Sequence, residues 1–470
     1  MNVFIKKLVG FSLGPIIGAF ISFITIPITT YFVSPTEFGK ASMFMIVQSL
    51  AVTFLYFGID QSYAREYHEN NDKKKLFQNA LLLPLCVTFI LFIVICFYSV
   101  KFSIFLFNSP KYQNISVLFG IMLIFSVIER FILLSIRMEE RAVEYSIYNI
   151  FIKGLILIFT ILLIFLGRKD FTTVVYATIF GQIIGDLMLS TKYKILFKID
   201  RSFLNLRLIK KMILFGFPLI IAASVNNLLT TSGRFFLRGY STYSELGIYN
   251  AALKISSIIT VIQTAFTSFW VPTAYRWNKE RKGMKQFNAV GDLLLLAMTV
   301  MFFFVLFFKK YIVIILSSNY VSAQYVVGLL AMIPILYTLS EATTLGIAFS
   351  GKSYFNILVS LFSLLPNVLL CWLLVPIYGT VGAAIAAAVS YVVFCILRTW
   401  FSNLCGFKIS FKKQFINIVI FLMAALVNTY DKPSVAIANI VLFVIALLTQ
   451  YGTIKTIFDI KSNPDDWDFS

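Results

Sequence analysis

The chain has 470 residues, of which 59% are hydrophobic and 13% are charged, and its formal net charge is +19. Soluble globular proteins carry roughly 45–50% apolar and about 25% charged residues, so this composition excludes an ordinary soluble domain. Apolar runs of about 20 residues recur along nearly the whole chain, which predicts membrane-spanning α-helices and excludes the short alternating strands of a membrane β-barrel. We interpret the positive charge as basic residues in cytoplasmic loops rather than as a nucleic-acid surface.

Windows of about 20 residues divide the sequence into about 14 spans. The first span carries Gly10, Gly14 and Gly18 at GxxxG spacing, which permits close packing against another helix. Lys and Arg are most frequent in alternate loops, above all Tyr193–Lys211 and Arg276–Lys285, so we expect both termini to be cytoplasmic. The predicted spans are residues 8–33, 41–63, 80–100, 115–137, 145–167, 172–195, 211–233, 246–272, 289–309, 323–350, 354–375, 379–402, 413–430 and 434–457.

The second half of the chain repeats features of the first half at a constant distance. The motif SPTEFG after the first span is echoed by STYSELG after the seventh, which places Glu37 and Glu245 208 positions apart (245 − 37). Tyr112 before the fourth span and Tyr320 before the tenth have the same separation. The repeat predicts two homologous six-span lobes of the same topology. The predicted organisation is an N-lobe over 1–200, a C-lobe over 201–402, an extra C-terminal helix pair over 403–457 and an acidic cytoplasmic tail over 458–470.

The stretch Lys210–Gly247 contains the seventh span and starts the second copy of the repeat. At helical spacing, Asn227, Thr230, Arg234 and Arg238 fall on one face of this helix. A polar, cationic stripe on a membrane helix is costly unless it faces protein or water. We therefore interpret this helix as the hinge of a two-lobed transporter and as one wall of its cavity.

Charged residues inside the other spans are rare and mark functional candidates. Lys254 lies about two turns inside the eighth span, with Asn250 and Ser257 on the same predicted face. Arginine and lysine at such positions suit an anionic substrate, because a phosphate group needs cationic partners in a low-dielectric bundle. The predicted cationic substrate-binding set is Arg130, Lys153, Asn226, Asn227, Arg234, Arg238 and Lys254.

Alternatives to these roles stay open at the level of the sequence. Arg234 and Arg238 lie near a membrane interface and could extend to lipid headgroups. Lys153 could form a structural ion pair with an acidic residue of another span, for example Glu129. The acidic residues inside spans could couple transport to H+ or Na+, although neutralisation by a neighbouring cation is the competing interpretation. The predicted ion-coupling candidates are Glu129, Asp186 and Glu341, with Asp60 near the inner end of the second span.

Four stretches of the sequence are similar to a known family: Thr30–Leu50, Phe215–Leu237, Glu245–Ile259 and Leu374–Val393. Through them the sequence resembles the Wzx-type oligosaccharide flippases of bacterial polysaccharide biosynthesis, a branch of the multidrug/oligosaccharidyl-lipid/polysaccharide (MOP) exporter superfamily. The resemblance implies two six-helix lobes in a MATE-like arrangement around a central cavity. It also implies transfer of an undecaprenyl-pyrophosphate-linked oligosaccharide from the cytoplasmic to the outer leaflet of the bacterial inner membrane, for surface polysaccharides such as the O-antigen of lipopolysaccharide.

Motifs of catalysis and cofactor binding are missing from the sequence. There is no P-loop and no Gly-x-Ser-x-Gly elbow, and the single histidine, His68, has no metal-ligand partners nearby in sequence. We therefore expect a transporter without enzymatic activity, metal or cofactor. The expected partners are the lipid-linked oligosaccharide, membrane lipid, H+ or Na+, and in the cell a polysaccharide polymerase and a chain-length regulator. A MATE-type multidrug or cation antiporter is the main alternative function, and an integral-membrane polysaccharide polymerase is the other.

Overall fold

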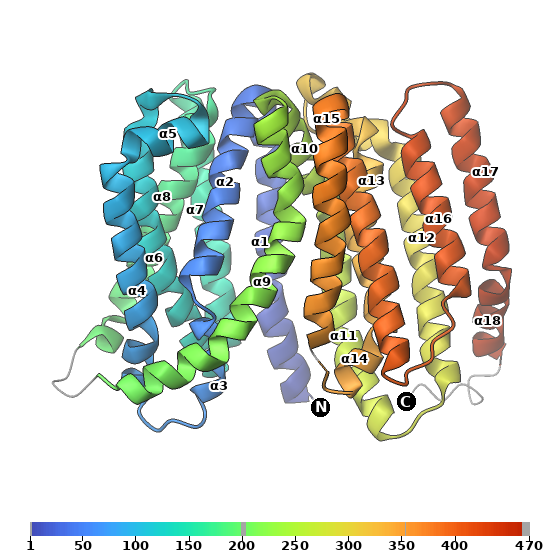
Figure 1. Cartoon of the computed structure of the whole chain (residues 1–470), viewed down its shortest axis with the longest axis horizontal. Helices are drawn as coiled ribbons and strands as arrows, with labels where there is room; N and C mark the ends of the chain where they lie inside the picture. Colours follow the sequence, from blue (N-terminus) through green and yellow to red (C-terminus); the bar gives the residue numbers. More distant parts are fainter. Residues whose placement is uncertain (1, 199–203, 353, 463–470) are drawn as a thin grey trace. The chain divides into compact units, whose positions relative to one another are not determined.

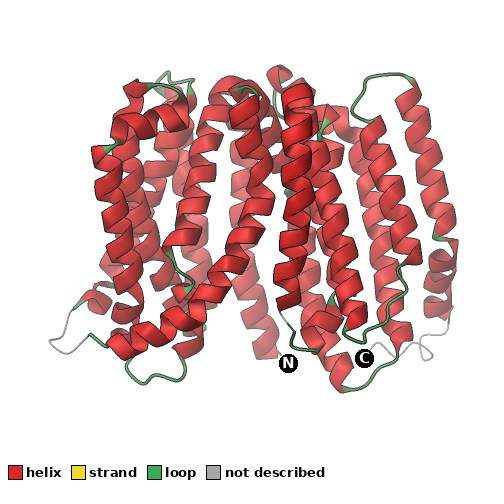
Figure 2. Cartoon of the chain, in the orientation of Figure 1, coloured by secondary structure: helices red, strands yellow, loops and turns green. Residues whose placement is uncertain are grey.

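The computed structural model describes residues 2–198, 204–352 and 354–462; the side chains of 2–13, 15, 222 and 457–461 lie outside this description. All regular structure in the described residues is helical, which confirms the predicted all-α class (Figure 2). The chain forms two compact units, Met1–Asn227 and Leu228–Ser470. The predicted lobe boundary at residue 200 falls in the undescribed segment 199–203 and stays a prediction, and most of the predicted acidic tail also lies outside the described residues.

The described helices include nine segments that are long and apolar enough to cross a membrane. A tenth is counted if η3 (Ser318–Tyr325) and α13 (Val327–Thr343), which are bent by 56°, form one span. One of the nine, α15 (Tyr354–Leu404), has 51 residues and would be roughly 75 Å long if straight, against about 30 Å for a bilayer core. It is broken at Gly379, where φ is 51°, so it covers the predicted eleventh and twelfth spans. Each predicted span coincides with part or all of one to three helices, and the chain is a multi-pass membrane protein.

Unit 1 is built around the contacts of α6 with α4 and α8, while α1 packs along α7 (Figure 1). The predicted close packing of the first span is confirmed at Gly14, where an added Cβ atom would lie 2.5 Å from the Cα atom of Ser146 in α7. The backbone N–H of Gly14 donates to Ser146 Oγ over 3.1 Å. The helices of this unit are α1 (Asn2–Phe32), α2 (Pro35–Leu55), α3 (Ile59–Glu66), α4 (Lys73–Phe97), α5 (Ser99–Phe107), η1 (Pro110–Tyr112), α6 (Gln113–Met138), α7 (Ala142–Phe165), α8 (Phe171–Lys192), η2 (Lys194–Phe197) and the first part of α9 (Leu206–Tyr240).

Unit 2 is organised around α13, which contacts α12 and α15 (Figure 1). The C-terminal helices belong to this unit: buried Gln450 donates to Thr299 of α12 and to Asn417 of α16, over 2.9 Å each. Besides α13, α15 and η3, the unit contains the second part of α9, α10 (Tyr243–Ser256), α11 (Ile258–Lys279), α12 (Met284–Ile314), α14 (Leu345–Phe349), α16 (Lys412–Val427), α17 (Ser434–Thr449) and α18 (Tyr451–Ser462).

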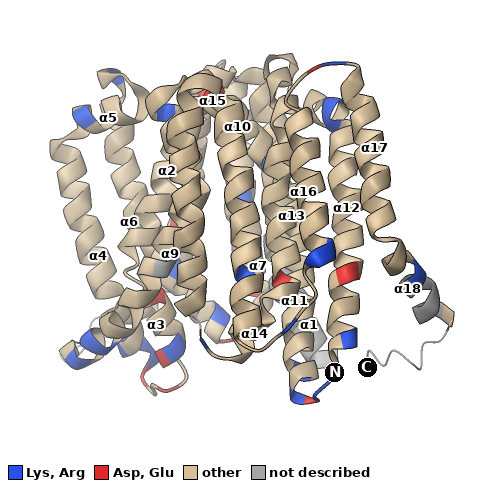
Figure 3. Ribbon diagram, turned by 45° about the vertical axis from the view of Figure 1, so that its right-hand side comes forward, with Lys and Arg blue, Asp and Glu red and all other residues tan. Residues whose placement is uncertain are grey.

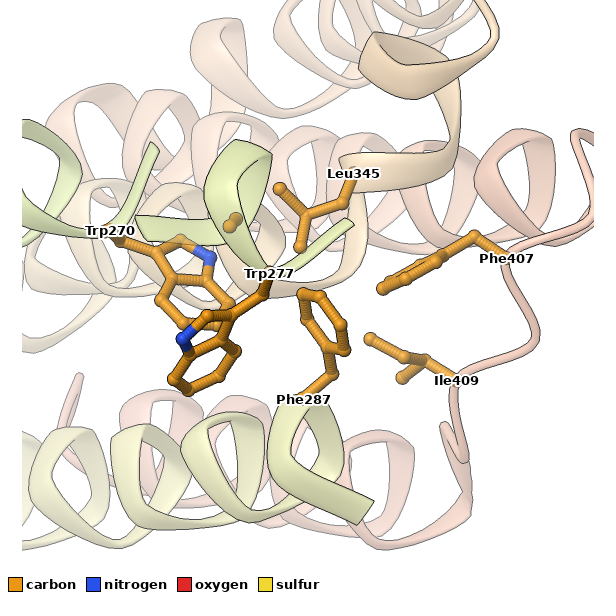
Figure 4. Close-up of a cluster of buried hydrophobic side chains, with 7 residues drawn as sticks. Trp270, Trp277, Phe287, Leu345, Phe407 and Ile409 are labelled. Carbon is orange, nitrogen blue, oxygen red and sulfur yellow. The ribbon is translucent and has the colours of Figure 1, made fainter. Parts of the chain in front are cut away.

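An aromatic cluster fixes the end of α11 within unit 2. Trp270 and Trp277 of α11 pack edge-on against Phe287 at the start of α12, with ring centroids 6.0 and 5.4 Å apart (Figure 4). Leu345 of α14 and Phe407 after α15 complete the buried side of the cluster. One face of α11 is thereby anchored to the rest of the unit.

The predicted second span is not continuous, because the chain breaks between α2 and α3. Phe57 and Gly58 both have left-handed backbone conformations, with φ of 51° and 67°. The break brings Gly58 against Gly216 of α9 so closely that a Cβ atom on Gly216 would lie 2.6 Å from the Gly58 carbonyl oxygen. Next to this contact Ser62 donates to the Met212 carbonyl over 2.7 Å. The first part of α9 is therefore held by α2 and α3.

This contact predicts an asymmetric response to two glycine-to-alanine changes. Gly216→Ala should lower the free energy of unfolding by about 1–3 kcal/mol, because the added methyl group overpacks a backbone-to-backbone contact. Gly154→Ala in α7 is the matched control, since a Cβ atom there meets nothing within 4 Å and alanine favours a helix by roughly 0.5–1 kcal/mol. Thermal unfolding of the purified variants measures both. Equal melting temperatures would show that α9 is not tightly held here.

The sequence repeat reappears as the same contact in both units. Glu37 accepts a hydrogen bond from the backbone N–H of Phe171, the first residue of α8, over 3.0 Å. Glu245, at the equivalent position of α10, accepts from the backbone N–H of Thr380, directly after the break in α15, over 2.7 Å. A carboxylate stabilises a helix N-terminus because the first N–H groups lack partners within the helix. The two glutamates of the repeat therefore both accept a hydrogen bond at the start of a helical segment.

Candidate functional site

Most Lys, Arg, Asp and Glu residues lie toward the helix ends, so the few within helices need a separate explanation (Figure 3). The predicted site residues divide between the units at Asn227. Unit 1 holds the predicted residues Glu129, Arg130, Lys153, Asp186, Asn226 and Asn227, and unit 2 holds Arg234, Arg238, Lys254 and Glu341.

Arg130 is engaged by a carboxylate inside unit 1. Its Nη2 atom lies 2.6 Å from Oδ2 of Asp60, whose side chain is 7% exposed. The guanidinium also lies over the ring of Tyr56, 5.4 Å from its centroid. Asp60 is the second residue of α3, so the ion pair joins α3 to α6. The substrate role of Arg130 stays a prediction.

Two of the predicted coupling residues lie together in unit 1. The amide nitrogen of Gln182 in α8 donates to Glu129 Oε2 over 2.7 Å and to Asp186 Oδ1 over 2.9 Å. Asp186 is fully buried, and among the described residues its side-chain oxygens have only this amide as partner. A buried carboxylate with no cation beside it is costly when charged, so binding of a proton or a metal cation would stabilise it. The sequence analysis did not single out Gln182, although it lies one turn before Asp186.

Lys153 and the two asparagines occupy the edge of unit 1. Lys153 is exposed and close enough to Glu129 to interact with it electrostatically, and its stem lies beside Gly18 of α1. Asn226 is exposed. Asn227 donates to Thr53 Oγ1 of α2 over 2.8 Å, so it adds to the contacts that hold the first part of α9.

The second part of α9 carries two cations in unit 2. Arg234 is half-buried and donates to the carbonyl of Thr230, one turn earlier, over 3.2 Å. Within the described residues no carboxylate lies within ion-pair distance of Arg234, and its Nε atom is buried without a hydrogen-bond partner. Arg238 lies over the ring of Tyr243 at 4.5 Å. A half-buried guanidinium whose N–H groups are not all used in hydrogen bonds within the protein can bind an anion.

Lys254 lies at the end of α10, where the predicted eighth span is interrupted. The helix ends at Ser256, and α11 begins at Ile258. The predicted face of Lys254, Asn250 and Ser257 is only partly correct. Asn250 is buried and donates to its own helix, whereas Ser257 is exposed and its hydroxyl donates to the Lys254 carbonyl over 2.6 Å. Asn250 and Lys254 both lie within α10, one turn apart, whereas Ser257 lies at the break between α10 and α11.

Glu341 of α13 forms a buried ion pair with Arg398 of α15. Nη1 of Arg398 lies 2.7 Å from Glu341 Oε1 and 2.8 Å from Ser340 Oγ, and the two charged side chains are 11% and 8% exposed. The structure thus supports the competing interpretation of Glu341, a carboxylate neutralised by a neighbouring cation. Sequence reasoning missed Arg398, although it lies within the predicted span 379–402.

The repeat shows that the two units use equivalent positions differently. Positions 129 and 186 of unit 1 correspond to Tyr337 and Phe394 of unit 2, whose rings stack with centroids 5.7 Å apart. One turn further, Glu341 and Arg398 correspond to Leu133 and Ser190. The carboxylate pair therefore belongs to unit 1 alone. Among the described residues no group of three or more His, Cys, Asp or Glu side chains is placed to hold a metal ion.

Comparison with known protein families shows which family the chain belongs to. The profile of the family "Polysaccharide biosynthesis protein" matches residues 4–277, more than half of the sequence. The chain belongs to this polysaccharide biosynthesis protein family. The resemblance drawn from the sequence is thus confirmed. No curated protein sequence matches the chain.

Solved structures with the same fold are membrane transporters. The lipid II flippase MurJ in its inward closed conformation superposes with a TM-score of 0.66 at 14% identity, covering 98% of this chain and 99% of that one. An inward-facing multidrug resistance MATE transporter of the MOP superfamily gives 0.60 at 16% identity, covering 84% and 94%. A MOP transporter from Pyrococcus furiosus, described as having a binding pocket of reverse polarity, gives 0.56 at 15% identity, covering 85% and 95%. At these identities the similarity shows a shared fold, which confirms the predicted MATE-like architecture.

Proposed function

We propose that this member of the polysaccharide biosynthesis family moves an undecaprenyl-pyrophosphate-linked oligosaccharide from the cytoplasmic to the outer leaflet of the bacterial inner membrane. Transport would proceed by alternating access of the two lobes and would supply surface polysaccharide such as the O-antigen. Both termini would be cytoplasmic. A polysaccharide polymerase and a chain-length regulator would act on the product.

The observation that carries this proposal is Arg234. It lies within α9, a helix long enough to cross a membrane, its buried Nε atom has no hydrogen-bond partner, and it has no carboxylate partner among the described residues. Arg238 follows one turn later and Lys254 lies on the next helix of the same unit. A pyrophosphate is the anion that such a group of cations suits, since a guanidinium donates two parallel hydrogen bonds to phosphate oxygens.

The cellular test is deletion of the gene followed by analysis of lipid-linked sugars. Cells without the protein should accumulate the oligosaccharide lipid on the cytoplasmic side and lose surface polysaccharide. Complementation with the native gene should restore both. Unchanged polysaccharide together with altered tolerance to cationic drugs would contradict the proposal.

A cation antiporter of the MATE type is the second candidate function. The carboxylates Glu129 and Asp186 favour it, because two acidic side chains held together by one amide, one of them fully buried, attract cations. Under the flippase proposal the same pair binds the coupling ion, H+ or Na+, and the anionic lipid is bound by the cations of unit 2.

If Glu129 and Asp186 bind the coupling ion, replacing Asp186 should affect transport differently from replacing Glu341. Asp186→Asn should remove the stimulation of transport by an imposed H+ or Na+ gradient, because asparagine cannot exchange a proton and carries no charge for a metal cation. The double variant Glu341→Gln, Arg398→Met, which removes both charges of the buried pair, should keep the stimulation, because Glu341 is already neutralised by Arg398 in the native protein. Transport into proteoliposomes with and without each gradient measures both. An Asp186→Asn variant that still responds to either gradient would exclude this residue from coupling.

A further inference from the structure

The segment formed by α10 and α11 combines polarity and exposure in an unusual way. Among the nine described segments that could cross a membrane, it has the lowest mean hydropathy. The two segments with the next lowest hydropathy are α8 and α2. In their most apolar 18-residue stretches, 61% and 44% of the residues are buried inside the protein, whereas in α10–α11 only 22% are buried. A polar helix surface facing hydrocarbon is costly, so a span of low hydropathy should be well covered. The polar residues in the exposed part of this segment therefore need a separate explanation.

The polarity of α11 is concentrated in a row of hydroxyl groups. Thr260, Thr264 and Ser268 follow one another at four-residue spacing, which places them on one face of the helix. Thr260 and Thr264 are exposed and Ser268 is half-buried. The hydroxyls of Thr264 and Ser268 donate to the carbonyls one turn earlier, over 2.8 and 2.7 Å. Their proton is thus used within the helix, and their oxygen lone pairs remain to accept hydrogen bonds from a ligand.

The remainder of α11 shows that this hydroxyl face is distinct from a lipid-facing surface. Ile259 and Trp270 lie on the buried face. Ile258, Ile262 and Phe269 lie on another face and are 41%, 44% and 67% exposed. The helix therefore has one apolar exposed face that suits lipid and one exposed face lined with hydroxyls. Two exposed environments on a single span indicate that the hydroxyl face contacts a hydrated or polar ligand.

The charge pattern of α11 indicates which class of ligand its hydroxyl face suits. From Ile258 to Tyr275 the helix contains no Asp, Glu, Lys or Arg. Such a face attracts neither cations nor anions, but neutral hydroxyl groups recognise the hydroxyls of a sugar. Lys254 lies one turn before Ser257, where this face begins, so a neutral sugar chain and a phosphate group would meet adjacent surfaces.

We propose that Thr260, Thr264 and Ser268 form a sugar-binding track that contacts the oligosaccharide of the transported lipid. The inference rests on the proposed function and adds the part of the substrate that this face recognises. The track provides acceptors spaced one helical turn apart, about 6 Å along the axis, which is within reach of successive hydroxyls of a bound sugar chain. Loss of its hydroxyls should weaken binding of the sugar but not of the pyrophosphate.

The test uses the full-length protein in lipid nanodiscs and two probes: undecaprenyl pyrophosphate, and the same lipid carrying a neutral disaccharide. The native protein should bind the sugar-bearing lipid about tenfold more tightly or better, as expected for two or three added hydrogen bonds. The triple variant Thr260→Val, Thr264→Val, Ser268→Ala should bind both lipids equally, with its affinity for the bare lipid unchanged. Thr273→Val is the matched control, because Thr273 bonds to its own helix in the same way over 2.9 Å but lies on the opposite side from Thr264.

The possible results of this test distinguish failure of the sugar-binding track from failure of the proposed function. A triple variant that keeps the full preference for the sugar-bearing lipid would overturn the track, as would a native protein that binds both lipids equally well. A control variant that loses the preference as strongly as the triple variant would also overturn it. A native protein that binds neither lipid would overturn the proposed function, and the track with it.

Discussion

Replacing Arg234 with alanine is expected to weaken binding of a pyrophosphate-linked lipid by roughly 10–100-fold and to lower the transport rate at limiting substrate accordingly. The physical reason is the loss of one charge-assisted hydrogen-bonding group, which contributes about 1.5–3 kcal/mol, where 1.4 kcal/mol equals tenfold. Arg234→Lys should keep part of the activity, because it retains the charge but not the paired donors. Binding to protein in nanodiscs and surface polysaccharide in complemented cells measure the effect.

Two further variants show whether the effect belongs to a binding site. Arg234→Ala combined with Lys254→Ala should abolish polysaccharide export while the protein still inserts and purifies normally. Lys408→Ala, in the loop after α15, is the control for a general loss of positive charge and should transport normally. Full export by the double variant would remove the cationic site from the account, and the arginine would then be a residue that reaches toward lipid headgroups.

Breaking the Glu341–Arg398 ion pair on one side is expected to destabilise unit 2 by about 3–5 kcal/mol, because the remaining charge stays buried without a partner. Glu341→Gln and Arg398→Met should each show this loss alone. The double variant should recover most of the native stability, since both charges are then removed. Thermal unfolding of the purified proteins in detergent or nanodiscs measures all three.

A partly exposed ion pair in the same unit provides the control. Lys413 and Asp292 lie 2.6 Å apart with side chains 42% and 31% exposed. Asp292→Asn should cost less than about 1 kcal/mol, because solvent screens an exposed pair. If the single variants of Glu341 and Arg398 were as mild as Asp292→Asn, or if the double variant were as unstable as the single ones, Glu341 would regain its place as a candidate for ion coupling.

The helices could be predicted because membrane-spanning helices appear in the sequence as continuous apolar runs. The repeat could be predicted as well, and the structure gives it a physical basis, since Glu37 and Glu245 both accept a hydrogen bond from a backbone N–H at the start of a helical segment. The interruptions within spans could not. The break at Phe57 and Gly58 depends on the close approach of Gly216, and that contact joins residues far apart in the chain.

For the charged residues, the sequence likewise predicts their presence inside spans but not their partners. Their presence inside spans marked them as candidates, but spacing in the sequence does not show which carboxylate meets which cation. Arg130 meets Asp60, Glu341 meets Arg398, and Asp186 meets only an amide among the described residues. Arg234 has no carboxylate within ion-pair distance among the described residues. The substrate-binding role of the predicted cationic set stays a prediction.

The central claim is that the cations of α9 and α10 bind the pyrophosphate of a lipid that this protein carries across the membrane. The most direct measurement is the transfer of an undecaprenyl-pyrophosphate-linked oligosaccharide, labelled on its sugar, between the leaflets of proteoliposomes that contain the purified protein. The account predicts transfer well above that of protein-free liposomes, and a loss of this transfer in the Arg234→Ala, Lys254→Ala variant. Transfer no faster than in protein-free liposomes, together with uptake of a fluorescent organic cation by the same preparation, would contradict it.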